Sequence, residues 1–104
     1  MVPTIPSIES PLVHELIGGE PYAYFPLGNY VVRAPGVCGG RATFKYTRIE
    51  VSFILNRLAQ GKSIEYIVDA YADPHLTRAA IQEAMLLANS AFTTSPQITE
   101  PLAV

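Results

Sequence analysis

Basic and aromatic side chains alternate in residues 41–48, the stretch of the sequence whose residue types most directly suggest binding chemistry. Arg41, Lys45 and Arg48 are interleaved there with Phe44 and Tyr46. Cations pair with phosphates and rings stack on bases, so such a stretch can hold nucleic acid. It can equally be a solvated strand edge whose charges prevent aggregation, or a dimer surface. The enrichment of tyrosine and arginine at protein interfaces favours the dimer surface.

The single cysteine, Cys38, is a candidate nucleophile, but catalysis needs a lowered thiol pKa and a nearby base. The candidate bases are His14 and His75, and neither lies at a spacing diagnostic of such a pair. One cysteine and two distant histidines also make a poor metal site. We therefore expect Cys38 to be a small residue in a glycine-rich bend, and we expect no enzymatic activity, no cofactor and no metal.

Two further features have a functional and a structural interpretation. Gly36, Gly39 and Gly40 could cradle a phosphate with their backbone N–H groups. Phosphate loops place such glycines directly before a helix, whereas here a strand is expected next, so a tight turn is the better interpretation. His75 could sense pH, but packing or hydrogen bonding within a turn between helices is the stronger expectation.

Charge is unevenly distributed along the 104 residues, although the net charge is only −2. Residues 21–49 carry four basic side chains and no acidic one, whereas both flanking segments are acidic. An anionic partner would therefore be met first in this middle zone. A single cysteine excludes an internal disulfide and suggests a cytoplasmic setting. No apolar run approaches the ~20 residues needed to cross a membrane.

The N-terminal half is expected to contain a tail, a possible short helix and a β-hairpin. Residues 1–20 are predicted to be a tail with a possible short helix, in which Ser10 would be the N-cap and Gly18 and Gly19 would end the helix. Residues 22–25 and 30–32 are rich in strand formers and flank a turn, which predicts a β-hairpin. Residues 43–45 could add a third short strand.

Three helices are predicted after the hairpin, because apolar residues recur there at i, i+3, i+4 and i+7. Thr47 and Glu50 have the spacing of a capping box, and Ser63 and Thr77 are the expected N-caps of the later helices. Short links force these helices to pack together. The predicted inward residues of the third helix are Ile81, Ala84, Met85, Ala88 and Phe92.

The predicted fold is therefore mainly α, a three-helix bundle with a small N-terminal β-hairpin. The chain is expected to be one domain, 1–104, whose last two helices have helix-turn-helix connectivity. Its parts are a tail with a possible short helix at 1–20, the hairpin and glycine-rich basic segment at 21–46, the bundle at 47–92, and a tail at 93–104.

Four segments of the sequence resemble a known family, DUF433, over roughly residues 33–90. Residues 40–51, Gly-Arg-Ala-Thr-Phe-Lys-Tyr-Thr-Arg-Ile-Glu-Val, are similar to its Gly-x-Pro-x-(Ile/Phe)-Lys-Gly-Thr-Arg-Ile-x-Val segment. Residues 61–65 and 74–77 resemble its two later landmarks, and residues 35–40 its lead-in. The resemblance implies a homeodomain-like helix-turn-helix and, for some members, a VapB-like antitoxin found beside a PIN-domain toxin.

The sequence departs from the family pattern at three places. Ala42 replaces the usual proline, and Tyr46 replaces the usual glycine. If that glycine serves a turn with positive φ, Tyr46 must carry strain or adopt another conformation. Ala72 and Asp73 extend the turn between the last two helices.

These observations give one leading function and one alternative. The leading expectation is a DNA-binding or antitoxin-like regulatory protein, in which Arg41, Lys45 and Arg48 contact the DNA backbone. The alternative is an interaction module that sequesters a PIN-like nuclease without binding DNA. The side chains expected to face the DNA groove are Arg78 and Gln82, and those expected at a homodimer or partner interface are Tyr22, Tyr24, Tyr30, Phe44 and Tyr46.

Overall fold

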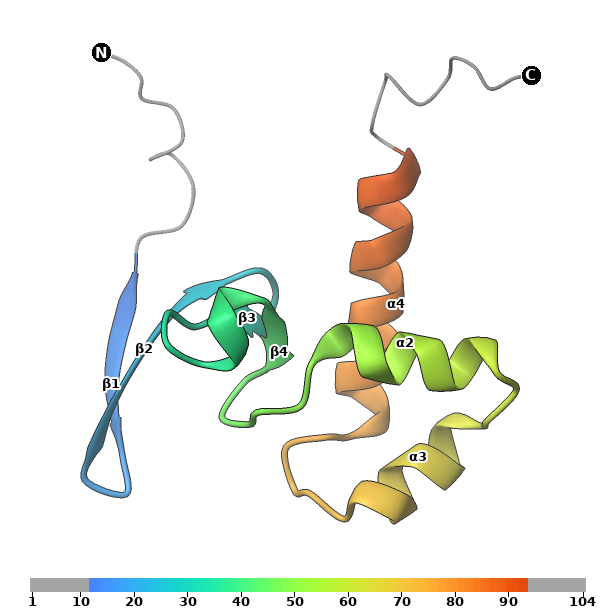
Figure 1. The fold of residues 1–104 in the computed structure, drawn as a ribbon, viewed down its shortest axis with the longest axis horizontal. Helices are drawn as coiled ribbons and strands as arrows, with labels where there is room; N and C mark the ends of the chain where they lie inside the picture. Colours follow the sequence, from blue (N-terminus) through green and yellow to red (C-terminus); the bar gives the residue numbers. More distant parts are fainter. Residues whose placement is uncertain (1–11, 94–104) are drawn as a thin grey trace.

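The computed structural model describes residues 12–93, and it places a four-stranded antiparallel sheet beside three α-helices (Figure 1). The strands follow one another across the sheet in chain order, with the β1–β2 hairpin farthest from the helices in Figure 1. None of the described helices is long and apolar enough to cross a membrane. The elements are β1 (Val13–Ile17), β2 (Glu20–Pro26), β3 (Val31–Arg33), the short 3-10 turn η2 (Cys38–Gly40), β4 (Ala42–Phe44), α2 (Val51–Ala59), α3 (Ile64–Tyr71) and α4 (Arg78–Thr93).

The prediction of a mainly α fold with one small hairpin is wrong, because strands make up a full sheet of mixed α/β architecture. Residues 13–17, predicted as part of a short helix, form strand β1 instead. Val13 and Glu15 are half-buried while His14 and Leu16 are exposed, which is the alternation of a strand. Ser10 lies outside the described residues.

The turns of the sheet follow from residues that tolerate positive φ. Gly18 and Gly19 have φ values of +59° and +85°, and they join β1 to β2 with Ile17 opposite Glu20. This is the two-residue hairpin turn that favours positive φ at both positions. The predicted hairpin at 22–25 and 30–32 is present as β2–β3, and the predicted third strand is present as β4.

The sheet separates two apolar clusters, because neighbouring residues of β3 face opposite ways. Val31 packs with the helices in the main core, while Val32 packs with Tyr24 and Ala34 on the other face. The main core joins all three helices to β3 and β4. Its buried members are Val31, Phe44, Val51, Ile54, Ile67, Leu76, Ala80, Ile81 and Ala84.

The N-caps of α3 and α4 were predicted correctly, because each is a hydroxyl that bonds to a backbone N–H three residues later. The Ser63 hydroxyl accepts from the Tyr66 N–H at 3.0 Å, and the Thr77 hydroxyl accepts from the Ala80 N–H at 3.2 Å. The predicted capping box of α2 is wrong: Glu50 is the N-cap without a side-chain cap bond. Thr47 instead donates its hydroxyl to the Phe44 carbonyl at 2.8 Å and accepts from the Ile49 N–H.

The second half of α4 extends beyond the core, which corrects the expected inward positions there. Met85 is 43% exposed and Phe92 is 70% exposed, and Ala88 is also exposed. The helical periodicity continues past residue 84, but no described element packs over these side chains to bury them. Periodicity alone therefore overestimated how much of the helix the core covers.

Glu83 on α4 connects the sheet to the helices. Its carboxylate accepts the Asn29 N–H at 3.0 Å and the Tyr30 N–H at 3.0 and 3.2 Å. A Cβ at Gly28 would collide with this carboxylate, so a larger residue there would displace the Glu83 side chain from the turn. The β2–β3 turn is thus held against α4 by a charged acceptor 53 and 54 residues away in the sequence.

Glu83→Ala is expected to lower the free energy of unfolding by about 1–2 kcal/mol, because two backbone N–H groups lose a charged acceptor. Glu65→Ala is the matched control, since Glu65 forms an exposed ion pair with Arg78 and should contribute less than about 0.5 kcal/mol. Urea denaturation of both variants measures the difference. Equal losses would contradict the structural role of Glu83.

Candidate functional site

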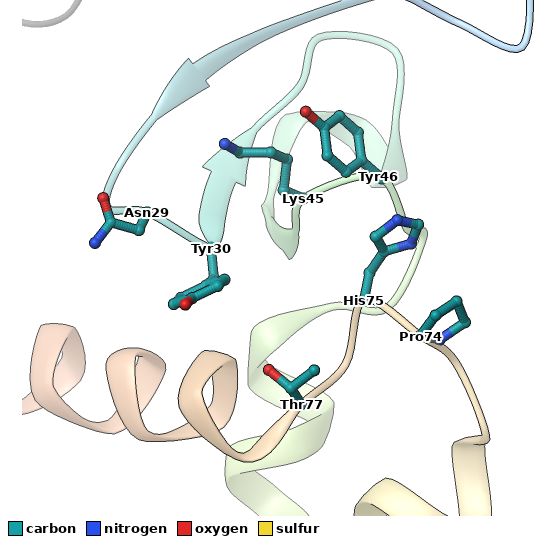
Figure 2. A pocket seen from close by; sticks show the side chains of 7 residues that line it. All are labelled: Asn29, Tyr30, Lys45, Tyr46, Pro74, His75 and Thr77. Atoms are coloured by element: carbon teal, nitrogen blue, oxygen red, sulfur yellow. The ribbon is translucent and has the colours of Figure 1, made fainter.

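Three turns that are distant in the sequence meet around one pocket, which we call the three-turn pocket (Figure 2). The β2–β3 turn, the β4–α2 turn and the α3–α4 turn each contribute to its walls. Its volume is about 270 Å³. In Figure 2 the Lys45 side chain reaches across the mouth between Asn29 and Tyr46. The lining residues are Asn29, Tyr30, Lys45, Tyr46, Pro74, His75 and Thr77.

The β4–α2 turn has a tyrosine where the backbone favours glycine. The Thr47 N–H donates to the Phe44 carbonyl at 3.0 Å, and the third residue of this turn, Tyr46, has φ +69°. A positive φ at that position is typical of a type II turn, where glycine is the usual residue. Tyr46 therefore adopts a backbone conformation that favours glycine. For a tyrosine this conformation costs a strain energy of order 1 kcal/mol or more.

Contacts with the β1–β2 hairpin offset this strain. The Tyr46 N–H donates to the Tyr22 hydroxyl at 3.0 Å, and the Tyr46 hydroxyl donates to the Glu15 carboxylate at 2.8 Å. The Tyr24 hydroxyl donates to the second oxygen of Glu15 at 2.8 Å. The Tyr22 ring lies 5.2 Å from the Tyr24 ring and 5.4 Å from the Tyr46 ring, centroid to centroid. We call Glu15, Tyr22, Tyr24 and Tyr46 the tyrosine cluster.

The hydrogen bonds of the tyrosine cluster set its protonation. The pKa of Glu15 is lowered, first by the Tyr24 hydroxyl and then by that of Tyr46. Burial, followed by the bond to Glu15, raises the pKa of Tyr24 to about 12. The bond to Glu15 is the largest cause of the raised pKa of Tyr46. At neutral pH Glu15 is therefore an ionised carboxylate that accepts hydrogen bonds from the neutral phenols of Tyr24 and Tyr46.

Lys45 is held at the pocket by aromatic rings. Its ammonium lies 5.3 Å from the centroid of the Tyr24 ring and 5.7 Å from that of Tyr46. Cation–π attraction of this kind contributes roughly 0.5–1 kcal/mol at partly exposed sites. Lys45 forms no ion pair with a carboxylate of residues 12–93.

The α3–α4 turn places His75 against Tyr46. Ala72 ends α3 with φ +50°, and the Asp73 carboxylate then accepts the His75 N–H at 2.8 Å. The two inserted residues thus form a helix cap and a side-chain-stabilised turn. The rings of His75 and Tyr46 meet edge to face at 5.2 Å. The interpretation of His75 as a residue that packs and hydrogen-bonds within this turn is confirmed.

Three of the five residues predicted to contact DNA have contacts within the chain. Arg41 forms a two-pronged pair with Glu50, at 3.0 Å for each bond, and this pair also lowers the pKa of Glu50. Arg78 pairs with Glu65 on α3. Lys45 lies in the three-turn pocket. The two that remain exposed without a described ion pair are Arg48 and Gln82.

The residues predicted at a dimer or partner interface fall into three groups. Phe44 is fully buried and Tyr24 is 4% exposed, so both belong to the cores of the chain itself. Tyr22 and Tyr46 are half-buried in the tyrosine cluster. Tyr30 is 41% exposed beside the pocket. The homodimer stays a prediction.

The glycine-rich segment forms a tight turn, as the better of its two interpretations predicted. Cys38, Gly39 and Gly40 have φ values of +49°, +66° and +83°, and the Gly40 N–H bonds to the Val37 carbonyl at 2.9 Å. The Cys38 thiol donates to the Arg48 carbonyl at 3.3 Å. Within residues 12–93, no three His, Cys, Asp or Glu side chains lie close enough to share a metal ion.

Sequence reasoning missed the parts of the site that depend on contacts between distant residues. The sequence alone singles out neither Asn29, which lines the pocket, nor Glu83, which holds the β2–β3 turn. It does not single out Glu15 either. One signal was available for Glu15: a tyrosine at a glycine position must be compensated by something, and the hydroxyl of Tyr46 needs an acceptor.

Comparison with known proteins gives one match. The model of the family described as "Protein of unknown function (DUF433)" matches residues 31–88. No curated protein and no solved structure matches the chain. Strands β1 and β2, which carry Glu15, Tyr22 and Tyr24, precede the matched residues.

Tyr46→Phe is expected to raise the pKa of Glu15 toward its ordinary value of about 4.5, because one of two phenol donors is lost. The folded pKa of Glu15 lies below its unfolded value. Its contribution to stability is therefore present above the unfolded pKa and is lost as pH falls through the folded pKa. Carboxyl titration by NMR measures the shift.

The control for this substitution is Tyr66→Phe, whose ring lies beside Lys62 and outside the tyrosine cluster. It should leave the Glu15 titration unchanged. The stability advantage of the wild type over Tyr46→Phe should also shrink in acid. A Glu15 pKa that does not respond to Tyr46→Phe would show that the hydroxyl contact is absent in solution.

Proposed function

The chain belongs to the DUF433 family of proteins of unknown function, and we propose that it is a non-catalytic protein-binding module that receives its partner at the three-turn pocket. One observation carries the proposal. Two segments that mark the family resemblance, around Lys45 and at residues 74–77, converge on the same pocket although about 30 residues separate them. If members of the family share a binding role, we expect their partner to bind at a pocket that both segments line.

The β2–β3 turn beside the pocket supports a protein partner. Leu27 and Tyr30 on this turn are 39% and 41% exposed. Exposed aromatic and aliphatic side chains are typical of the centre of a protein interface, where charged residues are depleted. The resemblance supplies the class of partner: a PIN-like nuclease encoded beside this chain, which an antitoxin-like module would sequester.

DNA binding is the second candidate, and one observation favours it. Two arginine side chains lie beside η2: Arg33 lines a shallow pocket with Gly39 and Gly40, and Arg41 lies against Gly39. Against it, the exposed start of α4 lies beside acidic residues of α3, since Arg78 shares a surface pocket with Glu65 and Asp69. Two or three phosphate contacts would give a log–log salt slope of about −2 to −3.

Asn29→Trp is expected to weaken co-purification with the neighbouring gene's product at least tenfold, because an exposed side chain at the pocket wall is replaced by a large ring that fills it. Asn56→Trp is the matched control: the same change on the exposed surface of α2, at a residue that does not line the three-turn pocket. Co-expression followed by affinity purification makes the comparison.

Two results would contradict the proposal. The wild-type chain could fail to retain the nuclease-like protein at all, or Asn29→Trp could retain it as well as Asn56→Trp does. If the chain instead binds its upstream DNA with the expected salt slope and does not co-purify with the nuclease-like protein, DNA binding is the better-supported function.

A further inference from the structure

We infer that the three-turn pocket receives the carboxylate of an acidic side chain on the partner protein. This rests on the proposed function, since it names the part of the partner that enters the pocket. It follows from which polar groups at the pocket are already hydrogen-bonded within the chain and which are left for a ligand.

The carboxylates around the pocket all have donors of their own. Each oxygen of Glu15 accepts one phenol, from Tyr24 and from Tyr46. Glu83 accepts the two turn N–H groups, and Asp73 accepts the His75 N–H. These acids therefore serve as structural acceptors. None of them lies within ion-pair distance of the Lys45 ammonium, which acts on Glu15 only through a weaker Coulomb attraction that helps to lower the Glu15 pKa.

The side-chain groups that remain at the pocket can all donate. They are the Lys45 ammonium, the Asn29 amide and the Tyr30 hydroxyl, whereas Nδ1 of His75 already lies 3.5 Å from the Asp73 carboxylate. The Thr77 hydroxyl is excluded from this set because it caps α4. A concave site lined by donors and one unpaired ammonium is complementary to an anionic oxygen group.

The size and walls of the pocket select the kind of anion. At about 270 Å³ the pocket is slightly smaller than the ~300–1,000 Å³ typical of sites for whole small molecules, so it suits a single side chain. The Tyr46 and His75 rings provide an apolar wall for the methylene stem of a glutamate. Because the rings of Tyr24 and Tyr46 already hold Lys45, less side-chain freedom is lost on binding.

The test is an NMR titration of the full ¹⁵N-labelled chain with three probes: glutamate blocked at both ends, the equally blocked glutamine, and inorganic phosphate. Blocked glutamate should shift the backbone amide signals of Asn29, Tyr30, Lys45, Tyr46 and His75 in a saturable way. Its apparent affinity should exceed that of blocked glutamine at least fivefold, because the neutral amide cannot pair with the ammonium.

Lys45→Met keeps the length and apolar stem of the side chain and removes its charge. It should reduce glutamate binding at least fivefold. Lys62→Met is the matched control, since the Lys62 ammonium also lies over a tyrosine ring, 5.1 Å from the Tyr66 centroid, but outside the three-turn pocket. It should leave the titration unchanged.

Equal binding of glutamine and glutamate would overturn the inference, as would unaltered binding by Lys45→Met. Tighter binding of phosphate than of glutamate would overturn it as well and would assign the pocket to a phosphorylated ligand. Co-purification separates this inference from the proposed function. If Lys45→Met retains the partner fully while Asn29→Trp loses it, the inference of an acidic side chain in the pocket is wrong, but the proposed protein-binding function is still supported.

Discussion

The carboxylate of Glu83 determines how the sheet meets the helices. It accepts the backbone N–H groups of Asn29 and Tyr30, and it lies where a Cβ of residue 28 would otherwise be. These bonds fix the β2–β3 turn against α4, and that turn is one wall of the three-turn pocket. Without them, the turn would keep its bond from the Lys45 N–H to the Tyr30 carbonyl at 2.7 Å but would lose its hydrogen bonds to α4. A single charged acceptor thus connects the fold to the site.

Tyr46 shows how a departure from a family pattern can be accommodated. Its backbone adopts the left-handed conformation that a glycine would adopt, and it is held there by a Tyr22 hydroxyl and a Glu15 carboxylate. Both partners come from the β1–β2 hairpin, which precedes the residues matched by the family model. The hairpin and the tyrosine therefore form one structural unit. Replacing Tyr46 would remove the hydroxyl bond to Glu15, whereas the backbone N–H of residue 46 could still donate to the Tyr22 hydroxyl.

Sequence reasoning succeeded where local chemistry decides the structure. The helix starts at Ser63 and Thr77 follow from a single hydroxyl and a nearby N–H. It failed at β1, where a few apolar residues satisfy both a helical stripe and a strand, and pairing with β2 decides between them. It also failed at Glu50, because a long-range pair with Arg41 replaces the expected cap.

The candidate site was only partly predictable for the same reason. The sequence singles out Lys45 as a candidate binding residue, and the structure places it at the three-turn pocket. Its neighbours Asn29 and His75 come from turns that only the tertiary fold brings together. The most direct test of the account is the affinity of Glu83→Ala for blocked glutamate, compared with wild type under conditions where both are fully folded. If Glu83 acts by holding the β2–β3 turn in place, affinity falls several-fold even though a negative charge near the pocket has been removed. If affinity rises or stays the same, the charge alone mattered and the pocket does not depend on that turn.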